Sequence, residues 1–518
     1  MARRAFSVIG AGVAALVAAL TLLPLGAVFL RAGGWPEFGP GDGAAVRFTL
    51  TQALISALVS CVLAVPVARA LARRDFPGRG LLIAVMGAPF ILPVIVAVLG
   101  LVAVFGRSGV VNDLLGLFGL PRLSIYGFGG VVLAHVFLNL PLAVRMVLQG
   151  WQAIPAERFR LADALDLGPS GRWRHLELPM LREVLPGAFV VIFVLCLTSF
   201  AVALTLGGGP KATTVELAIY QAVKFDFDLG RAGLLSAVQF GLCLLAALIG
   251  WRWALPAGFG AGVGRSFGLA SERGWRLWLD VVAIFLAALF LLVPLGAVIL
   301  RGLPGLMDLP EAVWWALARS VMVAVLSMAV TMAAALGLAL GAASLGQRRS
   351  AAAIDAAAAL PLAVSALVMG MGLFLIVQPL VLPSRVALPV TVLVNAVLTL
   401  PFAYRLLVPQ ARALEADYGR LSAALDLGGM AWLRWVALPR LARPLGFGAG
   451  ISVAFSMGDL GVIALFAGDQ GATLPLVVQR LMSAYRIDQA MSAALVLVVV
   501  SFALFWACDA WGRRHAVA

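Results

Sequence analysis

The chain has 518 residues, of which 63% are hydrophobic and only 12% are charged, and its mean hydropathy is +1.04. A soluble protein of this size could not bury so much apolar surface, so the composition excludes a set of soluble domains and predicts a protein whose main solvent is lipid. The net charge of +14 does not indicate nucleic-acid binding, because Lys and Arg form short clusters between apolar runs rather than a basic stripe.

Runs of about twenty apolar residues predict about twelve membrane-spanning helices. The first run follows Arg3 and Arg4 and is longer than the apolar core of a cleaved signal sequence, so it predicts a retained first helix. The spans are expected near residues 8–30, 50–72, 82–106, 126–149, 185–207, 232–254, 278–300, 317–341, 352–379, 386–408, 445–467 and 489–511.

Lys and Arg are unevenly divided between the segments that connect these spans. With the N-terminus placed in the cytoplasm, the cytoplasmic segments hold most of the basic residues, which is the positive-inside pattern. The C-terminus, with Arg513 and Arg514, then lies on the same side. We therefore expect a multi-pass protein in the lipid bilayer of a bacterial inner membrane, with both termini in the cytoplasm.

An internal repeat relates the two halves of the chain. Residues 138–181 align without a gap on residues 398–441, at a constant offset of 260, so that "LNLPLAVR" corresponds to "LTLPFAYR" and "RLADALDLG" to "RLSAALDLG". Shared hydrophobicity does not explain matched Arg, Asp, Pro and Gly. The same offset relates three later pairs, Gly208 and Gly468, Thr213 and Thr473, and Asp228 and Asp488.

The repeat predicts the domain organisation. Six spans in each half preserve the direction of the chain across the membrane, so the halves are expected to be parallel and related by an axis along the membrane normal. The first half is expected over residues 1–255, a cytoplasmic linker over 256–277 and the second half over 278–518. A translocation path is expected between the halves.

The longest predicted cytoplasmic loops, 150–184 and 410–444, occupy equivalent positions in the two halves. Each is expected to form a short helix, a turn, a second short helix and then Leu-Pro. In the first loop, Phe159, Ala162 and Leu165 recur at helical spacing among charged residues, which predicts an amphipathic helix. Such a helix either lies on the membrane surface or packs on a partner protein, and its symmetric repetition favours the partner.

These loops resemble the coupling loop of ATP-binding-cassette importer permeases, a helix–turn–helix in which Leu-Pro follows a consensus Gly by about thirteen residues. Counted back from the two prolines, the consensus Gly falls on Asp166 and Asp426, and Gly stands two residues later. The consensus Glu falls on Arg160 and Arg420. The resemblance implies contacts with an ATPase at Arg160, Ala164, Asp166, Gly168 and Pro179, and at Arg420, Ala424, Asp426, Gly428 and Pro439.

Longer segments are similar to the permeases of thiamine and thiamine-pyrophosphate importers. They include "RRDFPGR", "LGGGPKATTVELAIYQAVKFDFDLGRA" and "SMGDLGVIALF". The resemblance implies an all-α, MetI-like fold of the type I importers and a pathway opened by alternating access. It also implies two copies of a separate ATPase subunit and a periplasmic thiamine-binding protein as partners. Fused ferric-iron permeases share this architecture and remain an alternative.

The sequence contains no motif for chemistry of its own. There is no phosphate-binding loop of the G-x-x-x-x-G-K-[ST] type, and no His, Cys or Ser constellation typical of a metal site or a nucleophile. We therefore expect a translocation subunit, not an enzyme, with no cofactor. A self-sufficient secondary transporter of twelve helices is a further alternative. It would need ionisable groups within the membrane, and only Asp459 is expected well inside a span.

Four polar residues within the spans are candidates for the translocation path. Asp459 either attracts a cationic cargo or binds a helix terminus, because a carboxylate in lipid needs a compensating partner. His135 and Asn139 lie on one helical face, and Asn395 is the repeat equivalent of His135. They either line the path or join helices by hydrogen bonds.

The segments 209–231 and 468–488 also occupy equivalent positions, on the side opposite the long loops. They carry several charged residues, which predicts either a surface that contacts the binding protein or a solvated loop. The contact candidates are Lys211, Asp226, Asp228, Asp469 and Arg486.

Overall fold

The computed structural model describes residues 2–31, 38–87, 91–207, 209, 212–251, 274–346, 349–427, 429–468 and 471–516, and its regular elements there are all helices. Within these ranges, eleven helices are long and apolar enough to cross a membrane, and the number is twelve if one bent pair of helices is counted as a span. The prediction of an all-α protein with about twelve spans is therefore confirmed.

The first half of the sequence contains twelve α-helices in its described part. These are α1 (Ala2–Arg31), α2 (Pro40–Arg73), α3 (Arg79–Val85), α4 (Val94–Phe105), α5 (Val110–Leu117), α6 (Phe128–Ala153), α7 (Ala156–Ala164), α8 (Pro169–Arg172), α9 (Leu178–Leu197), α10 (Ala201–Leu206), α11 (Val215–Lys224) and α12 (Leu229–Trp251). A π-helical turn, Trp173–Glu177, joins α8 to α9.

The described part of the second half repeats this order with fewer, longer helices. These are α13 (Trp275–Gly302), α14 (Glu311–Leu345), α15 (Arg349–Ala359), α16 (Ala366–Val377), α17 (Ala387–Ala424), α18 (Gly429–Trp432), α19 (Leu438–Met457), α20 (Gly461–Phe466), α21 (Leu474–Ser483) and α22 (Ile487–His515). A π-helical turn, Leu433–Ala437, again precedes the long helix α19.

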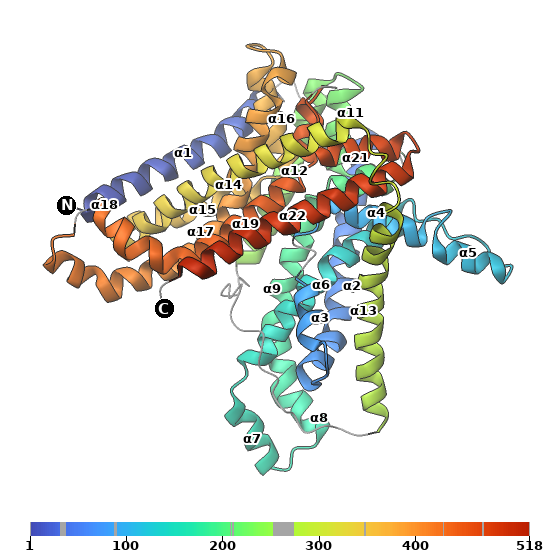
Figure 1. Cartoon of the computed structure of the whole chain (residues 1–518), viewed down its shortest axis with the longest axis horizontal. Coiled ribbons are helices and arrows are strands. Elements are labelled where there is room, and N and C mark those ends of the chain that lie inside the picture. The colour runs from blue at the N-terminus through green and yellow to red at the C-terminus, as the bar shows by residue number, and fades with distance from the viewer. Residues whose placement is uncertain are drawn as a thin grey trace.

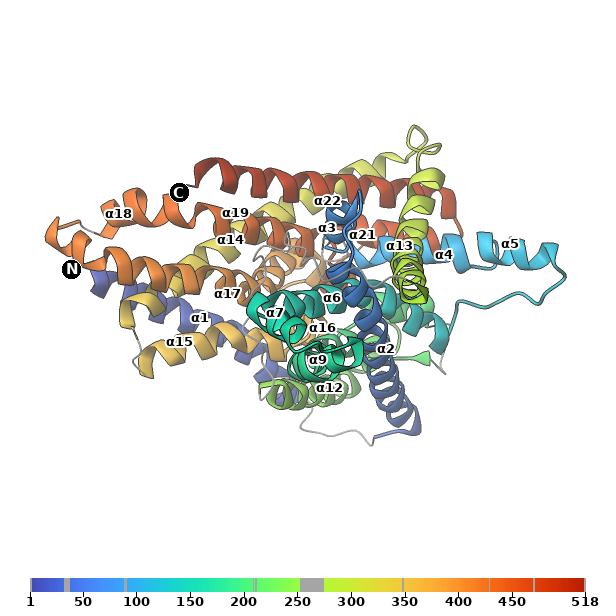
Figure 2. The ribbon, with the colours of Figure 1, turned by 90° about the horizontal axis from the view of Figure 1, so that it is seen from below.

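The long helices form two arms that diverge from a shared centre (Figure 1). In one arm α2, α6, α9 and α13 pack together, with α7 and α8 at the tip. The other arm contains α1, α14, α17, α19 and α22, with α18 and the N-terminus at its tip (Figure 2). Where the arms meet, one hydrophobic core joins residues of α11 and α12 to residues of α16 and α20. Both halves of the sequence therefore build the centre of the molecule.

The first helix of each half packs on the other half. Helix α1 lies against α14 and α16, and α13 lies against α2 and α4. A Cβ on Gly372 of α16 would lie 2.2 Å from the Pro24 carbonyl oxygen, and a Cβ on Gly100 of α4 would lie 2.6 Å from the Pro294 carbonyl oxygen. Glycine permits this close backbone approach between helices. The packing units thus differ from the sequence halves 1–255 and 278–518, and the expected linker lies mostly in 252–273, outside the described residues.

Several predicted spans are not continuous helices. The expected spans 185–207 and 445–467 are each interrupted at equivalent positions, 198–200 and 458–460. The expected span 352–379 bends by 93° after Ala363, because Pro361 cannot continue a helix and the Ser365 hydroxyl starts the next one by accepting from Val368 N. The expected span 82–106 falls on α3 and α4, with residues 88–90 outside the described part. Irregular backbone at membrane depth is tolerated where protein surrounds it.

Candidate functional site

The first predicted coupling loop has the expected helix–turn–helix, but the second begins differently. Helix α6 ends at Ala153, and Pro155 separates it from α7, because proline cannot donate the hydrogen bond that would continue α6. The repeat equivalent of Pro155 is Glu415, and here α17 runs without a break to Ala424. The prediction of a separate short helix in the second loop is therefore wrong; the last turns of α17 take its place.

Each loop buries one face and exposes another. Phe159 and Ala162 are buried in the first loop, whereas Leu165, predicted on the same apolar face, is 62% exposed. Leu165, which directly follows α7, therefore points away from the core. In each loop the exposed face includes one arginine, one alanine and two leucines at equivalent positions. These residues are Arg160, Leu161, Ala164 and Leu165 in the first loop, and Arg420, Leu421, Ala424 and Leu425 in the second.

The turns of the two loops share an unusual backbone conformation. Asp166 and Asp426 have φ of 49° and 46°, in the left-handed region that favours glycine. Leu167 N donates to Ala162 O at 2.9 Å, and Leu427 N donates to Ser422 O at 3.0 Å, which closes the helix end in the same way. The aspartates therefore occupy the position of the consensus Gly. Gly168 instead precedes α8 with φ −60°, and Gly428 lies outside the described residues.

The π-helical turns connect both loops directly to long helices, so Pro179 and Pro439 lie in the first turns of α9 and α19. Arg69 of α2 holds the first loop, because its Nε donates to Glu177 Oε2 at 2.6 Å and its guanidinium lies 5.1 Å from the Trp173 ring centre. The equivalent of Glu177 is Ala437, which offers no carboxylate. A movement of either loop is expected to reach the membrane helices through these turns.

The structure places Asn139, His135 and Asn395 inside the arms. Asn139 Nδ2 donates to His135 O at 2.9 Å and to Cys196 Sγ at 3.5 Å, joining α6 to α9. Asn395 Nδ2 donates to Ser456 Oγ at 3.1 Å, joining α17 to α19. Both asparagines therefore have the interhelical partners of the packing alternative. Both ring nitrogens of buried His135 lack a hydrogen-bond partner in the described part.

Asp459 lies at the break between α19 and α20. Its Oδ1 accepts from Gly461 N at 3.2 Å, which caps the first turn of α20, while Oδ2 is buried without a hydrogen-bond partner among the described residues. A helix-terminus role, one of the two alternatives, is thus present. Its second oxygen, Oδ2, takes no part in the cap.

Two of the predicted binding-protein contacts take part in an internal network. Buried Asp42 accepts from Arg231 Nη2 at 2.8 Å, and Arg231 Nη1 donates to Asp226 Oδ2 at 3.1 Å. Asp228 Oδ1 accepts from Arg231 N at 2.9 Å and starts α12. Asp226, Asp228 and Arg486 are all exposed. Lys211 and Asp469 lie outside the described residues.

Sequence reasoning missed two exposed aromatic residues in this region. Phe227, in the turn after α11, has φ 53° and is 80% exposed; Tyr485, in the turn after α21, has φ 59° and is 91% exposed. They are equivalent at an offset of 258, so the constant offset of 260 does not extend to Asp228 and Asp488. A bulky residue at positive φ is uncommon. In the sequence, the only available signal was an aromatic residue at the equivalent place in both halves.

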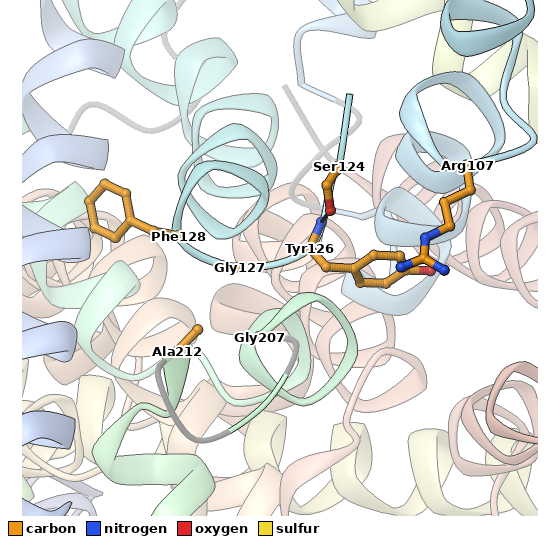
Figure 3. A pocket seen from close by; sticks show the side chains of 7 residues that line it. All are labelled: Arg107, Ser124, Tyr126, Gly127, Phe128, Gly207 and Ala212. Atoms are coloured by element: carbon orange, nitrogen blue, oxygen red, sulfur yellow. Dashed lines mark hydrogen bonds between the residues drawn. The ribbon is translucent and has the colours of Figure 1, made fainter. Parts of the chain in front are cut away.

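A cavity of about 550 Å³ lies at the N-terminal end of α6, beside residues that follow α4 and α10 (Figure 3). Figure 3 shows the Arg107 side chain reaching toward the Tyr126 ring, with Phe128 on the other side. All its lining residues come from the first half, so the cavity is not shared between the halves. They are Arg107, Ser124, Tyr126, Gly127, Phe128, Gly207 and Ala212.

The membrane-spanning helices in two equivalent halves, each with one helix–turn–helix loop, define a permease subunit of an ATP-binding-cassette importer. No family model matches the chain. It is 38% identical over 513 residues to the thiamine transport system permease protein ThiP of Brucella abortus (strain 2308), covering 95% of this chain and 93% of that protein. The corresponding proteins of Salmonella typhimurium and Escherichia coli K12 are each 37% identical, over 91% and 89% of this chain and 89% and 87% of theirs. The chain belongs to the family of thiamine transport system permease proteins.

Proposed function

We propose that the chain carries thiamine from the periplasm to the cytoplasm by alternating access, driven by separate ATPase subunits. The observation that carries the mechanism is the pair of coupling loops, which repeat the same left-handed turn and the same exposed face. A loop that only lay on the membrane would not need a matching face at the tip of each arm. Family membership and the thiamine named for the relatives support the cargo.

Each loop is proposed to dock one ATPase copy. The exposed leucines, Leu161 and Leu165 in the first loop and Leu421 and Leu425 in the second, offer apolar contacts beside Arg160 and Arg420. Exposed leucines are common singly, but matched pairs one helical turn apart are typical of a docking helix. Closure of the ATPase dimer on ATP would draw the loops together and open the opposite side of the path.

The proposed partner on the opposite surface is a periplasmic thiamine-binding protein. The turns that carry Phe227 and Tyr485 present exposed aromatic rings flanked by charged residues. Aromatic residues are enriched among the hot spots that dominate binding energy in protein interfaces. The charged candidates in these turns are Asp226, Asp228 and Arg486. Lys211 and Asp469, which lie outside the described residues, remain candidates from the sequence. The N- and C-termini belong to the arm whose tip carries α18 (Figure 1), which supports cytoplasmic termini on the coupling-loop side.

The test is reconstitution of the chain with its ATPase and binding protein in proteoliposomes, followed by uptake of radiolabelled thiamine. We expect uptake that requires ATP and both partners. Thiamine pyrophosphate and Fe(III) are offered in separate reactions, and Fe(III) transport with no thiamine transport would favour the iron alternative. ATP-independent uptake driven by an ion gradient would favour a secondary transporter.

Docking is tested in the same system with a paired variant, Leu161→Ser with Leu421→Ser. We expect co-purification of the ATPase and ATP-driven uptake to fall strongly. Leu123→Ser, at a similarly exposed leucine outside both loops, is the matched control and should change neither. Normal ATPase binding in the paired variant would contradict the proposed docking face.

A further inference from the structure

Glu216 has surroundings that differ from those expected from the sequence. The sequence places it among charged residues of a surface segment, yet it is 1% exposed, in the first turn of α11. Neither carboxylate oxygen has a hydrogen-bond partner in the described part of the chain. No ion pair joins it there to a lysine or arginine. A buried carboxylate without a partner is costly, so the group either takes up a proton or meets a cation that is not part of the described chain.

A second buried acceptor lies beside it. Gln239 of α12 is fully buried, and its amide group faces the Glu216 carboxylate. Gln239 Nε2 donates to Leu197 O at 2.9 Å, while Oε1 has no partner among the described residues. Glu216 and Gln239 therefore gather three buried acceptor oxygens that make no hydrogen bond of good geometry among the described residues. The Ser365 hydroxyl and the Gln239 amide lie near the Glu216 carboxyl group and partly offset the effect of burial on its pKa. Burial raises the pKa of Glu216 to about 8, as expected for a carboxylate that lacks a cationic neighbour.

The location of this cluster is the contact between the two halves. Helices α11 and α12 of the first half pack there against α16 of the second half, near the point where the arms diverge (Figure 1). Ser365, which starts α16, lies beside the Glu216 carboxylate. Asp459 lies close by, because Gly461, whose N–H it accepts, approaches Ala366 in the same turn of α16. The Oδ2 of Asp459, which has no hydrogen-bond partner among the described residues, is a further buried acceptor in this region.

The chemistry of the cluster favours an organic cation over a metal ion. Ca²⁺ takes about six to eight oxygen ligands and Mg²⁺ a nearly octahedral set, more than these side chains supply. A flat aromatic cation, whose charge is spread over a ring, needs only a carboxylate, an acceptor for its N–H groups and an aromatic neighbour. Tyr220 lies one helical turn from Glu216 on α11, and its ring centre is 5.2 Å from that of Phe200.

We propose that Glu216 and Gln239 form a binding site for an aromatic organic cation at the contact between the halves. The proposal rests on the function proposed above, since thiamine has a positively charged thiazolium ring and an aminopyrimidine whose N–H groups can donate to these oxygens. Glu216 would face the ring charge, and Gln239 Oε1 would accept from the amino group. The permease would then hold the cargo itself after the binding protein releases it.

The direct test measures equilibrium binding of radiolabelled thiamine to the purified permease–ATPase complex in detergent, without the binding protein. We expect the wild-type complex to bind thiamine and Glu216→Gln, which keeps the side-chain shape, to bind at least about tenfold more weakly, equivalent to 1.4 kcal/mol. Glu311→Gln, at an exposed glutamate in the first turn of α14, is the matched control and should bind as wild type does.

A second variant keeps the test decisive if Glu216→Gln does not fold. Gln239→Met removes the acceptor oxygen at similar volume and should weaken thiamine binding several-fold. Wild-type affinity in a folded Glu216→Gln protein would overturn the proposal, and a changed pH profile of uptake at unchanged affinity would identify a proton site instead. If the wild-type complex binds no thiamine but transports it, the binding site is refuted and the proposed function stands. Failure of wild-type uptake would refute the function.

Discussion

At the scale of single residues, Asp166 and Asp426 show how the chain departs from a family pattern without changing the turn. The left-handed region costs an L-residue roughly 1–2 kcal/mol, and Asp, with its short polar side chain, is one of the few residues that enters it. The two aspartates hold φ of 49° and 46° at the position that the family pattern assigns to Gly. Glycine stands two residues after that position in the sequence, but the left-handed backbone lies at the position that the count from proline gives.

Substitutions at this turn should therefore depend on backbone freedom rather than on charge. Asp166→Gly with Asp426→Gly is expected to retain the melting temperature and ATP-driven uptake. Asp166→Val forces a β-branched residue into the left-handed region and should lower both, by about 1–3 kcal/mol in stability. Asp417→Val, at an exposed site within helical α17, is the control and should have a small effect. Wild-type stability in Asp166→Val would show that the turn has a different backbone in solution.

Asp459 permits a similar separation of two roles. Asparagine can replace the cap that Oδ1 provides to Gly461 N, so Asp459→Asn should fold with an unchanged melting temperature. If the charge of Asp459 attracts the cargo, the initial rate of thiamine uptake falls several-fold. Asp459→Ala should lose about 1 kcal/mol of stability in addition, because the cap is then missing. Normal uptake by the asparagine variant would leave Asp459 with the capping role alone.

At the scale of elements, the exchanged helices α1 and α13 decide how the halves hold together. Each reaches the opposite half through a proline on the exchanged helix and a glycine on the receiving one, Pro24 on Gly372 and Pro294 on Gly100. Glycine lacks a Cβ, so the backbone of the receiving helix can approach the carbonyl of the proline on the exchanged helix. The equivalent contacts join the halves on two sides of the centre.

This contact gives a prediction for a single methyl group. Gly372→Ala should destabilise the protein by about 1–3 kcal/mol, because the new Cβ would collide with the Pro24 carbonyl and the helices must separate. The melting temperature of the purified protein in detergent measures the effect. Gly12→Ala, on α1 where a Cβ has nothing within 4 Å, should be neutral or slightly stabilising. Equal melting temperatures for the two variants would contradict the close approach of α1 to α16.

At the scale of the whole molecule, sequence reasoning succeeded where the signal is local and repeated. Apolar runs of sufficient length predicted the spans, and the offset of 260 predicted the paired loops. It failed where the position or burial of a residue depends on packing against helices that are far away in the sequence. Helix exchange depends on contacts such as Pro24 on Gly372, and the burial of Glu216 depends on α16, which is far away in the sequence. The break of α6 at Pro155 was visible in the sequence, but its absence at Glu415 required comparison of the two halves.

The divergence of the arms leads to a prediction about the transport cycle. If each coupling loop docks one ATPase copy, as proposed, closure of the ATPase dimer on ATP should bring the two loops together, because each loop is also joined to one arm. Spin labels at Ser170 and Met430, exposed equivalents at the starts of α8 and α18, would report the distance by pulsed electron paramagnetic resonance. The four native cysteines are first replaced by alanine or serine.

We expect a shorter distance between the labels with a non-hydrolysable ATP analogue than without nucleotide, and a return to the longer distance with ADP. The matched control places both labels on one arm, at Ser170 and Arg182, where rigid packing should keep the distance constant in all states. Distances that do not respond to nucleotide would mean that the arms move by another route than their coupling loops. If the distance between the labels shortens only when the ligand-loaded binding protein is present as well as ATP, binding at the two opposite surfaces is coupled. Such coupling is reciprocal, so the ATPase would then also affect the affinity for the binding protein.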